Sequence, residues 1–210
     1  MPAAGPRTLV IETATGACSV ALIDAGGIVA ARHEVVGRGH AERLVPMIGE
    51  LLGDGRPDRI LVDCGPGSFT GVRVGLAAAR ALAFGWQVPV LGYSSLALIA
   101  AAVFAEHPDR ATVTIAITGG HGELFVQRFA AAPFAELAPL ASLLPADAAL
   151  LSATDPVHGS GAPALLAARG DTDGDDRLPV AADLRHLPPA FAMLPPQPIY
   201  GRAPDAKLPA

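Results

Sequence analysis

The chain has 210 residues, of which 51% are hydrophobic and 17% charged, a composition typical of one large or two small folded domains and not of a disordered protein. A formal net charge of −5 and an aromatic content of 5% argue against a protein that grips nucleic acid unaided, because such proteins usually carry a basic surface and stacking rings. Two cysteines are too few for a disulfide framework, and no apolar run approaches the roughly 20 residues of a membrane span. Since the N-terminus also lacks an apolar signal core, we expect a cytoplasmic protein.

The chain opens with three predicted strands, 8–12, 17–23 and 28–36, joined by turn sequences at 13–16 and 24–27. Short turns between successive strands predict an antiparallel meander.

Residues 40–52 predict a helix with one apolar side. Pro46 should either bend this helix or mark its true start. His40 and Glu42 suggest a metal or acid–base site. However, helical residues two apart do not face the same way, so we favour solvated first-turn residues.

The glycine-rich segment 64–75 follows an apolar strand at 59–63 and leads into a helix that continues through Ala- and Leu-rich residues 76–84. Ser68 or Thr70 is expected to cap this helix by accepting an amide hydrogen bond.

Four small residues recur every four positions along this helix, so they share one face: Gly71, Gly75, Ala79 and Ala83. The spacing alone favours packing of this stripe against the chain's own sheet or a neighbouring helix, because apolar helix faces usually belong to the core. The functional interpretation is a subunit interface, where a second helix approaches closely. Arg73 and Arg80, seven residues apart, share a different face.

A short strand at 88–92 and a helix that runs to about Phe104 complete the first half, and Ser94 or Ser95 is expected to cap this helix. Strands joined by helices should run parallel, so we predict a mixed α/β sheet flanked by helices. This element order is similar to one lobe of the actin-like fold. In that fold the first hairpin turn, here Glu12–Gly16, cradles a nucleotide phosphate, although a plain tight turn explains these residues equally well.

The second half has weaker patterns, which we interpret as a smaller, divergent lobe over 107–210 after an N-terminal lobe over 1–106. It consists of a hairpin from 111–118 and 123–129, a loosely periodic stretch to residue 187, an Asp- and Gly-rich loop at 170–177, a turn at 159–162 and a proline-rich extended segment at 187–200.

The glycine segment, read as GPGSFTGVRVGL over 65–76, resembles the signature of the TsaB (YeaZ) family. Further agreement lies at 81–84, 88–96, 11–15, 18–22, 40–44 and 46–47, and in the tail at 200–207. The resemblance covers nearly all of residues 8–105. It implies an actin-like fold in two lobes and a chain that is not itself an enzyme.

According to this resemblance, the chain is the dimerisation partner of the catalytic subunit TsaD, with the ATPase TsaE completing the complex. That complex transfers a threonylcarbamoyl group to the adenosine beside the anticodon of tRNA. ATP is used by the complex, and no tightly bound cofactor is expected here. Without TsaD the chain is expected to form a homodimer through the same helices, to meet tRNA only through the complex, and to have no membrane partner.

The resemblance also implies site residues. The expected partner interface comprises His40, Leu44, Gly71, Val72, Arg73, Gly75, Leu76, Ala79, Arg80 and Ala83. The expected nucleotide or phosphate loop comprises Thr13, Thr15, Gly67 and Ser68.

No catalytic residue and no metal ligand is expected. TsaD-like relatives bind a metal through two histidines four apart, where this chain has Ser95 and Ile99. The first strand ends in Glu12 where the family usually has Asp, and Thr118-Gly119-Gly120 replaces the common Asp-Ala-Arg. The alternative function is an autonomous ATP-dependent phosphotransferase or metallopeptidase, which requires turnover by the isolated chain.

Overall fold

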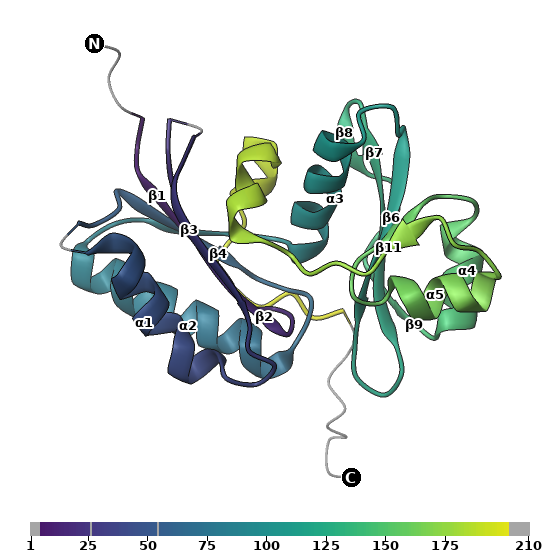
Figure 1. The fold of residues 1–210 in the computed structure, drawn as a ribbon, viewed down its shortest axis with the longest axis horizontal. Coiled ribbons are helices and arrows are strands. Elements are labelled where there is room, and N and C mark those ends of the chain that lie inside the picture. Colours follow the sequence, from purple (N-terminus) through teal and green to yellow (C-terminus); the bar gives the residue numbers. More distant parts are fainter. Residues whose placement is uncertain (1–4, 26, 54, 202–210) are drawn as a thin grey trace, which may run out of the picture.

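The computed structural model describes residues 5–25, 27–53 and 55–201, and it folds into two β-sheets with helices between and around them (Figure 1). Of the tail at 200–207 that resembles the family, residues 202–207 lie outside the described residues.

The first sheet has the strand order β3-β2-β1-β4-β5. Its strands are β1 (Thr8–Glu12), β2 (Ala17–Asp24), β3 (Gly27–Val35), β4 (Arg59–Asp63) and β5 (Val90–Tyr93). Neighbours are antiparallel from β3 to β1 and parallel from β1 to β5. The predicted meander followed by parallel strands is therefore confirmed, as is the mixed α/β architecture.

Two helices cover one face of this sheet, α1 (His40–Leu52) and α2 (Phe69–Trp86), and they lie side by side (Figure 1). Pro46 lies within α1 on its exposed side, so it does not mark the start of the helix. Ser68 is the N-cap of α2, and its hydroxyl accepts from the amide of Gly71 over 3.2 Å. The predicted cap is confirmed for Ser68.

The opposite face packs against α3 (Ser95–Glu106) and the short 3-10 helix η1 (Ala181–His186). Because α3 is apolar around most of its circumference, it is buried between the two sheets. Ser94 precedes α3 without a capping bond from its side chain, so the predicted hydroxyl cap is wrong there.

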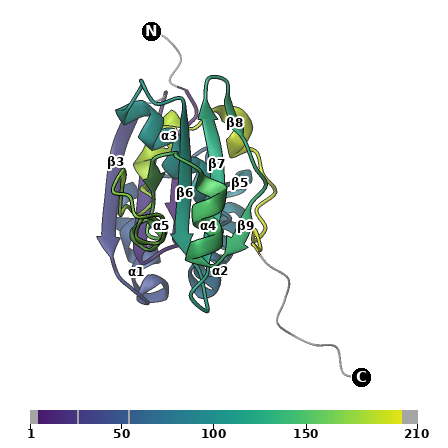
Figure 2. The ribbon, with the colours of Figure 1, turned by 90° about the vertical axis from the view of Figure 1, so that its right-hand side faces the viewer.

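The second sheet has the order β11-β10-β6-β7-β8, and β9 also pairs with β7. Its strands are β6 (Thr112–Thr118), β7 (Leu124–Ala131), β8 (Phe134–Glu136), β9 (Ala141–Leu143), β10 (Val157–His158) and β11 (Gly174–Asp175). The helices α4 (Pro145–Ser152) and α5 (Ala162–Arg169) cover its outer face (Figure 2). The β6–β7 hairpin is as predicted, but the expected loop at 170–177 contains β11.

One buried cluster joins the two sheets through α3 and includes Val10, Leu61, Leu98, Ile115 and Phe129. Residues on both sides of position 106 thus share a core, and the division into two lobes at that position stays a prediction.

The proline-rich segment after Leu187 returns to the first sheet. It contains the 3-10 helix η2 (Pro189–Ala192) and then runs in extended form beside β5. Gly92 and Leu194 exchange two backbone hydrogen bonds of 2.7 and 3.0 Å. The segment is extended, as predicted, except for η2, and it covers the edge of β5.

Candidate functional site

The small-residue stripe of α2 is buried inside the chain. Gly71, Gly75, Ala79 and Ala83 all face the first sheet. A Cβ atom at Gly71 would collide with the carbonyl oxygen of Thr13, and one at Gly75 with the Thr13 hydroxyl. The close approach that the glycines permit is therefore between α2 and the turn after β1.

This placement confirms the packing against the chain's own sheet that the spacing alone favours, and it corrects the subunit interface expected at the same residues. Val72 and Leu76 are buried with it, as are His40 and Leu44 on α1. The ring Nε2 of His40 lies 3.0 Å from the carbonyl oxygen of Ala17, so the solvated interpretation of His40 was wrong. Eight of the ten expected interface residues thus support the fold, and only Arg73 and Arg80 reach the surface.

The outer face of α2 carries the exposed side chains instead. Phe69 and Phe84 are 69% and 80% exposed, and Ala77 and Ala81 lie between them. Val45 on the neighbouring helix α1 is also exposed. We call these five exposed apolar residues the outer face of α1 and α2. Exposed large apolar side chains that gather on one face are typical of protein–protein contact sites.

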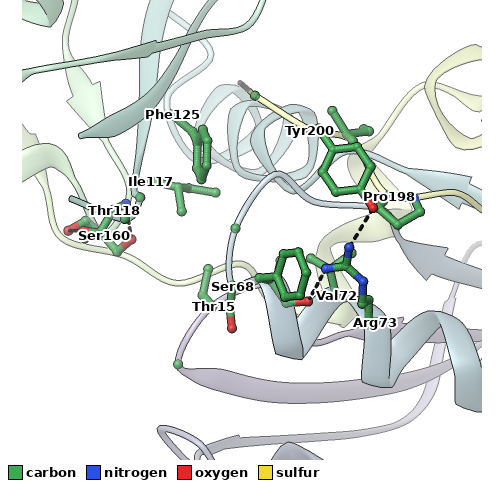
Figure 3. Close-up of a pocket in the computed structure, with 18 of the residues that line it drawn as sticks. Thr15, Ser68, Val72, Arg73, Ile117, Thr118, Phe125, Ser160, Pro198 and Tyr200 are labelled. Atoms are coloured by element: carbon green, nitrogen blue, oxygen red, sulfur yellow. Dashed lines mark hydrogen bonds between the residues drawn. The ribbon is translucent and has the colours of Figure 1, made fainter. Parts of the chain in front are cut away.

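A cleft of about 1050 Å³ lies between the two sheets (Figure 3). Thr15, Gly67 and Ser68 line it, whereas Thr13 is buried and donates its hydroxyl hydrogen bond to the carbonyl of Gly71 over 2.9 Å. Three members of the expected phosphate loop therefore meet at one cavity. The fourth holds α2 in place.

The other wall of the cleft comes from the second half of the chain. Thr118 and Ser160 are joined by two hydrogen bonds of 2.9 and 3.1 Å, and Phe125 lies beside them (Figure 3). The polypeptide from Pro198 to Gly201 completes the lining. Sequence reasoning missed this wall, because no motif marks residues that only the tertiary fold brings together.

Two carboxyl groups are buried where β1 and β4 end. Asp63 Oδ1 accepts from the hydroxyl of Ser95 over 2.6 Å and from the amide of Gly65 over 2.9 Å, while its Oδ2 has no hydrogen-bond partner among the described residues. Burial raises the pKa of Asp63 to about 7. Burial, and secondarily the charge of Asp63, raises the pKa of Glu12 well above its ordinary value. The pair therefore favours its protonated forms.

Ser95 and Ile99, the positions that the family resemblance matches to a pair of histidines, have structural roles here. Ser95 donates its hydrogen bond to Asp63, and Ile99 is packed in the core between the sheets. Within the described residues no three His, Cys, Asp or Glu side chains come together as a metal-binding group. None of the helices in the described ranges is long and apolar enough to cross a membrane.

Two curated relatives match part of this chain. TsaB of Escherichia coli (strain K12), a tRNA threonylcarbamoyladenosine biosynthesis protein, is 39% identical over 124 residues, which are 57% of this chain and 53% of that protein. The TsaB protein of Haemophilus influenzae is 43% identical over 104 residues, 47% of this chain and 44% of that protein.

The whole fold has a counterpart among solved structures. A Pseudomonas aeruginosa protein described as having similarity to peptidase YEAZ superposes with a TM-score of 0.80 at 30% identity, over 94% of this chain and 100% of that one. YeaZ from Pseudomonas aeruginosa superposes with a TM-score of 0.78 at 29% identity, over 93% and 99%. The model of the TsaD family, tRNA N6-adenosine threonylcarbamoyltransferase, matches residues 19–133.

The chain belongs to the TsaD family and, within it, to the TsaB (YeaZ) proteins. The match with the family model includes the glycine segment and α2, and the chain spans about half the length of the curated TsaB proteins that it matches.

Proposed function

We propose that this chain is a non-catalytic subunit of the machinery that makes threonylcarbamoyladenosine in tRNA, and that it pairs with and activates the catalytic subunit TsaD. The proposal rests on membership of the TsaB proteins, whose curated relatives carry that biosynthetic role in their names. The positions of the metal ligands in TsaD-like relatives are occupied by Ser95 and Ile99, and neither a hydroxyl nor an aliphatic side chain replaces an imidazole as a ligand.

Pairing takes place through the outer face of α1 and α2. With the glycine stripe turned inward, the face left for a partner carries Phe69, Phe84 and Val45, all more than half exposed. Aromatic side chains anchor many protein interfaces because each buries a large apolar area. In the absence of TsaD, a second copy of this chain occupies the same face.

ATP turnover and tRNA contact belong to the complex in this proposal. TsaE supplies the ATPase, and tRNA binds through the assembled complex, since a chain with a net charge of −5 offers little attraction to a polyanion.

Co-purification with TsaD from the same organism, followed by a tRNA modification assay with and without this chain, tests the proposal. We expect a stable complex and modification only when this chain is present. Full modification by TsaD and TsaE alone would contradict it. Turnover of ATP or of a peptide by the isolated chain would favour the alternative enzyme functions.

A further inference from the structure

The C-terminal segment is fastened to the edge of the outer face by two arginines of α2. Arg73 donates to the hydroxyl of Tyr200 over 2.8 Å and to the backbone carbonyl of Phe69 over 3.0 Å (Figure 3). Arg80 donates to the backbone carbonyl of Pro196. We call residues 194–200 the strap, since Gly92 also pairs with its first residue, Leu194.

The guanidinium group of Arg73 lies between two exposed rings. Its central carbon is 3.2 Å from the ring centre of Phe69 and 5.6 Å from that of Tyr200. Such a stack restricts the side chain to one orientation while leaving part of it open to a partner. Tyr200 is itself 61% exposed. Arginine and tyrosine are the residue types most enriched at interface hot spots.

Neither arginine has a carboxylate partner among the described residues. The hydrogen bonds that Arg73 and Arg80 make with described residues all go to uncharged oxygen atoms, and α2 contains no acidic residue. Each guanidinium has five N–H donors, of which Arg73 uses two and Arg80 one. Within the described ranges, two cations without a carboxylate partner therefore remain on the same side of a helix, in a chain whose net charge is −5.

We propose that the strap holds Arg73 and Arg80 in position to bind two carboxylates on the partner subunit, so that docking at the outer face depends on Tyr200. This inference rests on the proposed function and specifies the chemistry of that docking face. Arg73 and Arg80 are seven residues apart, which is about 10 Å along the helix axis. A partner helix with acidic residues about two turns apart would therefore place one carboxylate near each arginine. Charge-assisted pairs of this kind are the stronger class of hydrogen bond.

A second copy of this chain is the competing occupant. It would bring the arginines of one copy close to an equally basic α2 of the other, and like charges across an interface are unfavourable. The charge pattern therefore favours an acidic partner over self-pairing.

The experiment measures the dissociation constant of the chain with TsaD from the same organism, by calorimetry at low and high salt. Arg73→Glu and Arg80→Glu are each expected to weaken binding about ten-fold or more. Tyr200→Phe, which keeps the ring and removes the hydroxyl, is expected to weaken it about three-fold or more. Arg185→Gln on η1, exposed on the opposite side of the first sheet, is the matched control and should change nothing.

A double-mutant cycle separates positioning from simple contact. If Tyr200 acts through Arg73, Tyr200→Phe has no further effect in an Arg73→Gln background, and the salt dependence of binding is smaller in Arg73→Gln than in the wild type. Thermal unfolding of each variant shows that the fold is retained.

If the wild-type chain binds TsaD and the two arginine variants and Tyr200→Phe bind it with the same affinity, the inference is overturned and the proposed function stands. The inference also fails if these variants lose self-association, measured by sedimentation, while their affinity for TsaD is unchanged. A wild-type chain that does not bind TsaD at all would overturn both proposals.

Discussion

The hydroxyl of Thr13 donates a hydrogen bond to the carbonyl of Gly71 over 2.9 Å, and so joins the turn after β1 to the first turn of α2. The contact is buried, and it requires that neither Gly71 nor Gly75 carries a side chain. The conspicuous glycines of the signature therefore build the subunit itself. They fix the helix whose opposite side faces solvent.

Gly75→Ala should destabilise the chain, because the new Cβ atom would collide with the side chain of Thr13. Overpacking of this kind typically costs about 1–3 kcal/mol of unfolding free energy. Gly85→Ala, in the same helix with open space around its Cα, is the matched control and should be neutral or stabilise by up to about 1 kcal/mol. Urea denaturation of both variants measures the difference, and equal stability would contradict the packing described here.

His40→Ala should lower the free energy of unfolding by about 1–3 kcal/mol, since it leaves the carbonyl of Ala17 without its buried partner. Glu42→Ala, two residues further on and exposed, should change stability by less than about 0.5 kcal/mol. A solvated His40 would instead make the two substitutions equivalent in the same denaturation experiment.

Asp63→Asn should make stability less dependent on pH. Burial raises the pKa of Asp63 to about 7 in the folded chain, whereas an unfolded Asp has a pKa of about 3.9. A raised folded pKa means that stability is fully present below about pH 4 and is lost as the pH rises through about 7. Asparagine retains an oxygen for Ser95 and Gly65 but does not ionise.

The comparison is between denaturation at pH 5 and at pH 8. The wild type should lose more than about 1 kcal/mol between these values, because one pKa unit corresponds to about 1.4 kcal/mol. A variant that loses as much as the wild type would show that Asp63 is not the group responsible.

Much of the first sheet was predictable because its signals are local. Alternating apolar strands, the turn at 13–16 and the glycine segment each define an element without knowledge of its neighbours. The cap at Ser68 follows from the preference of an N-terminal amide for a nearby hydroxyl.

Which face of α2 is exposed to solvent was harder to predict. A four-residue period places Gly71, Gly75, Ala79 and Ala83 on one face and favours its burial, but the same pattern also fits a subunit interface. Phe69, Arg73, Arg80 and Phe84 recur at helical spacing as well, and that second pattern marks the outer face. The far wall of the cleft depends on contacts between residues more than forty positions apart, such as Thr118 and Ser160, which no short pattern encodes.

Phe84 tests the central claim most directly, since at 80% exposed it is the most exposed of the large apolar side chains on the outer face. Phe84→Glu should leave thermal stability unchanged and weaken binding to TsaD about a hundred-fold, because aromatic anchors often contribute 2 kcal/mol or more. Leu150→Glu, at an 83% exposed position on α4, is the control and should bind as the wild type does. Wild-type affinity in Phe84→Glu would contradict docking at the outer face of α1 and α2.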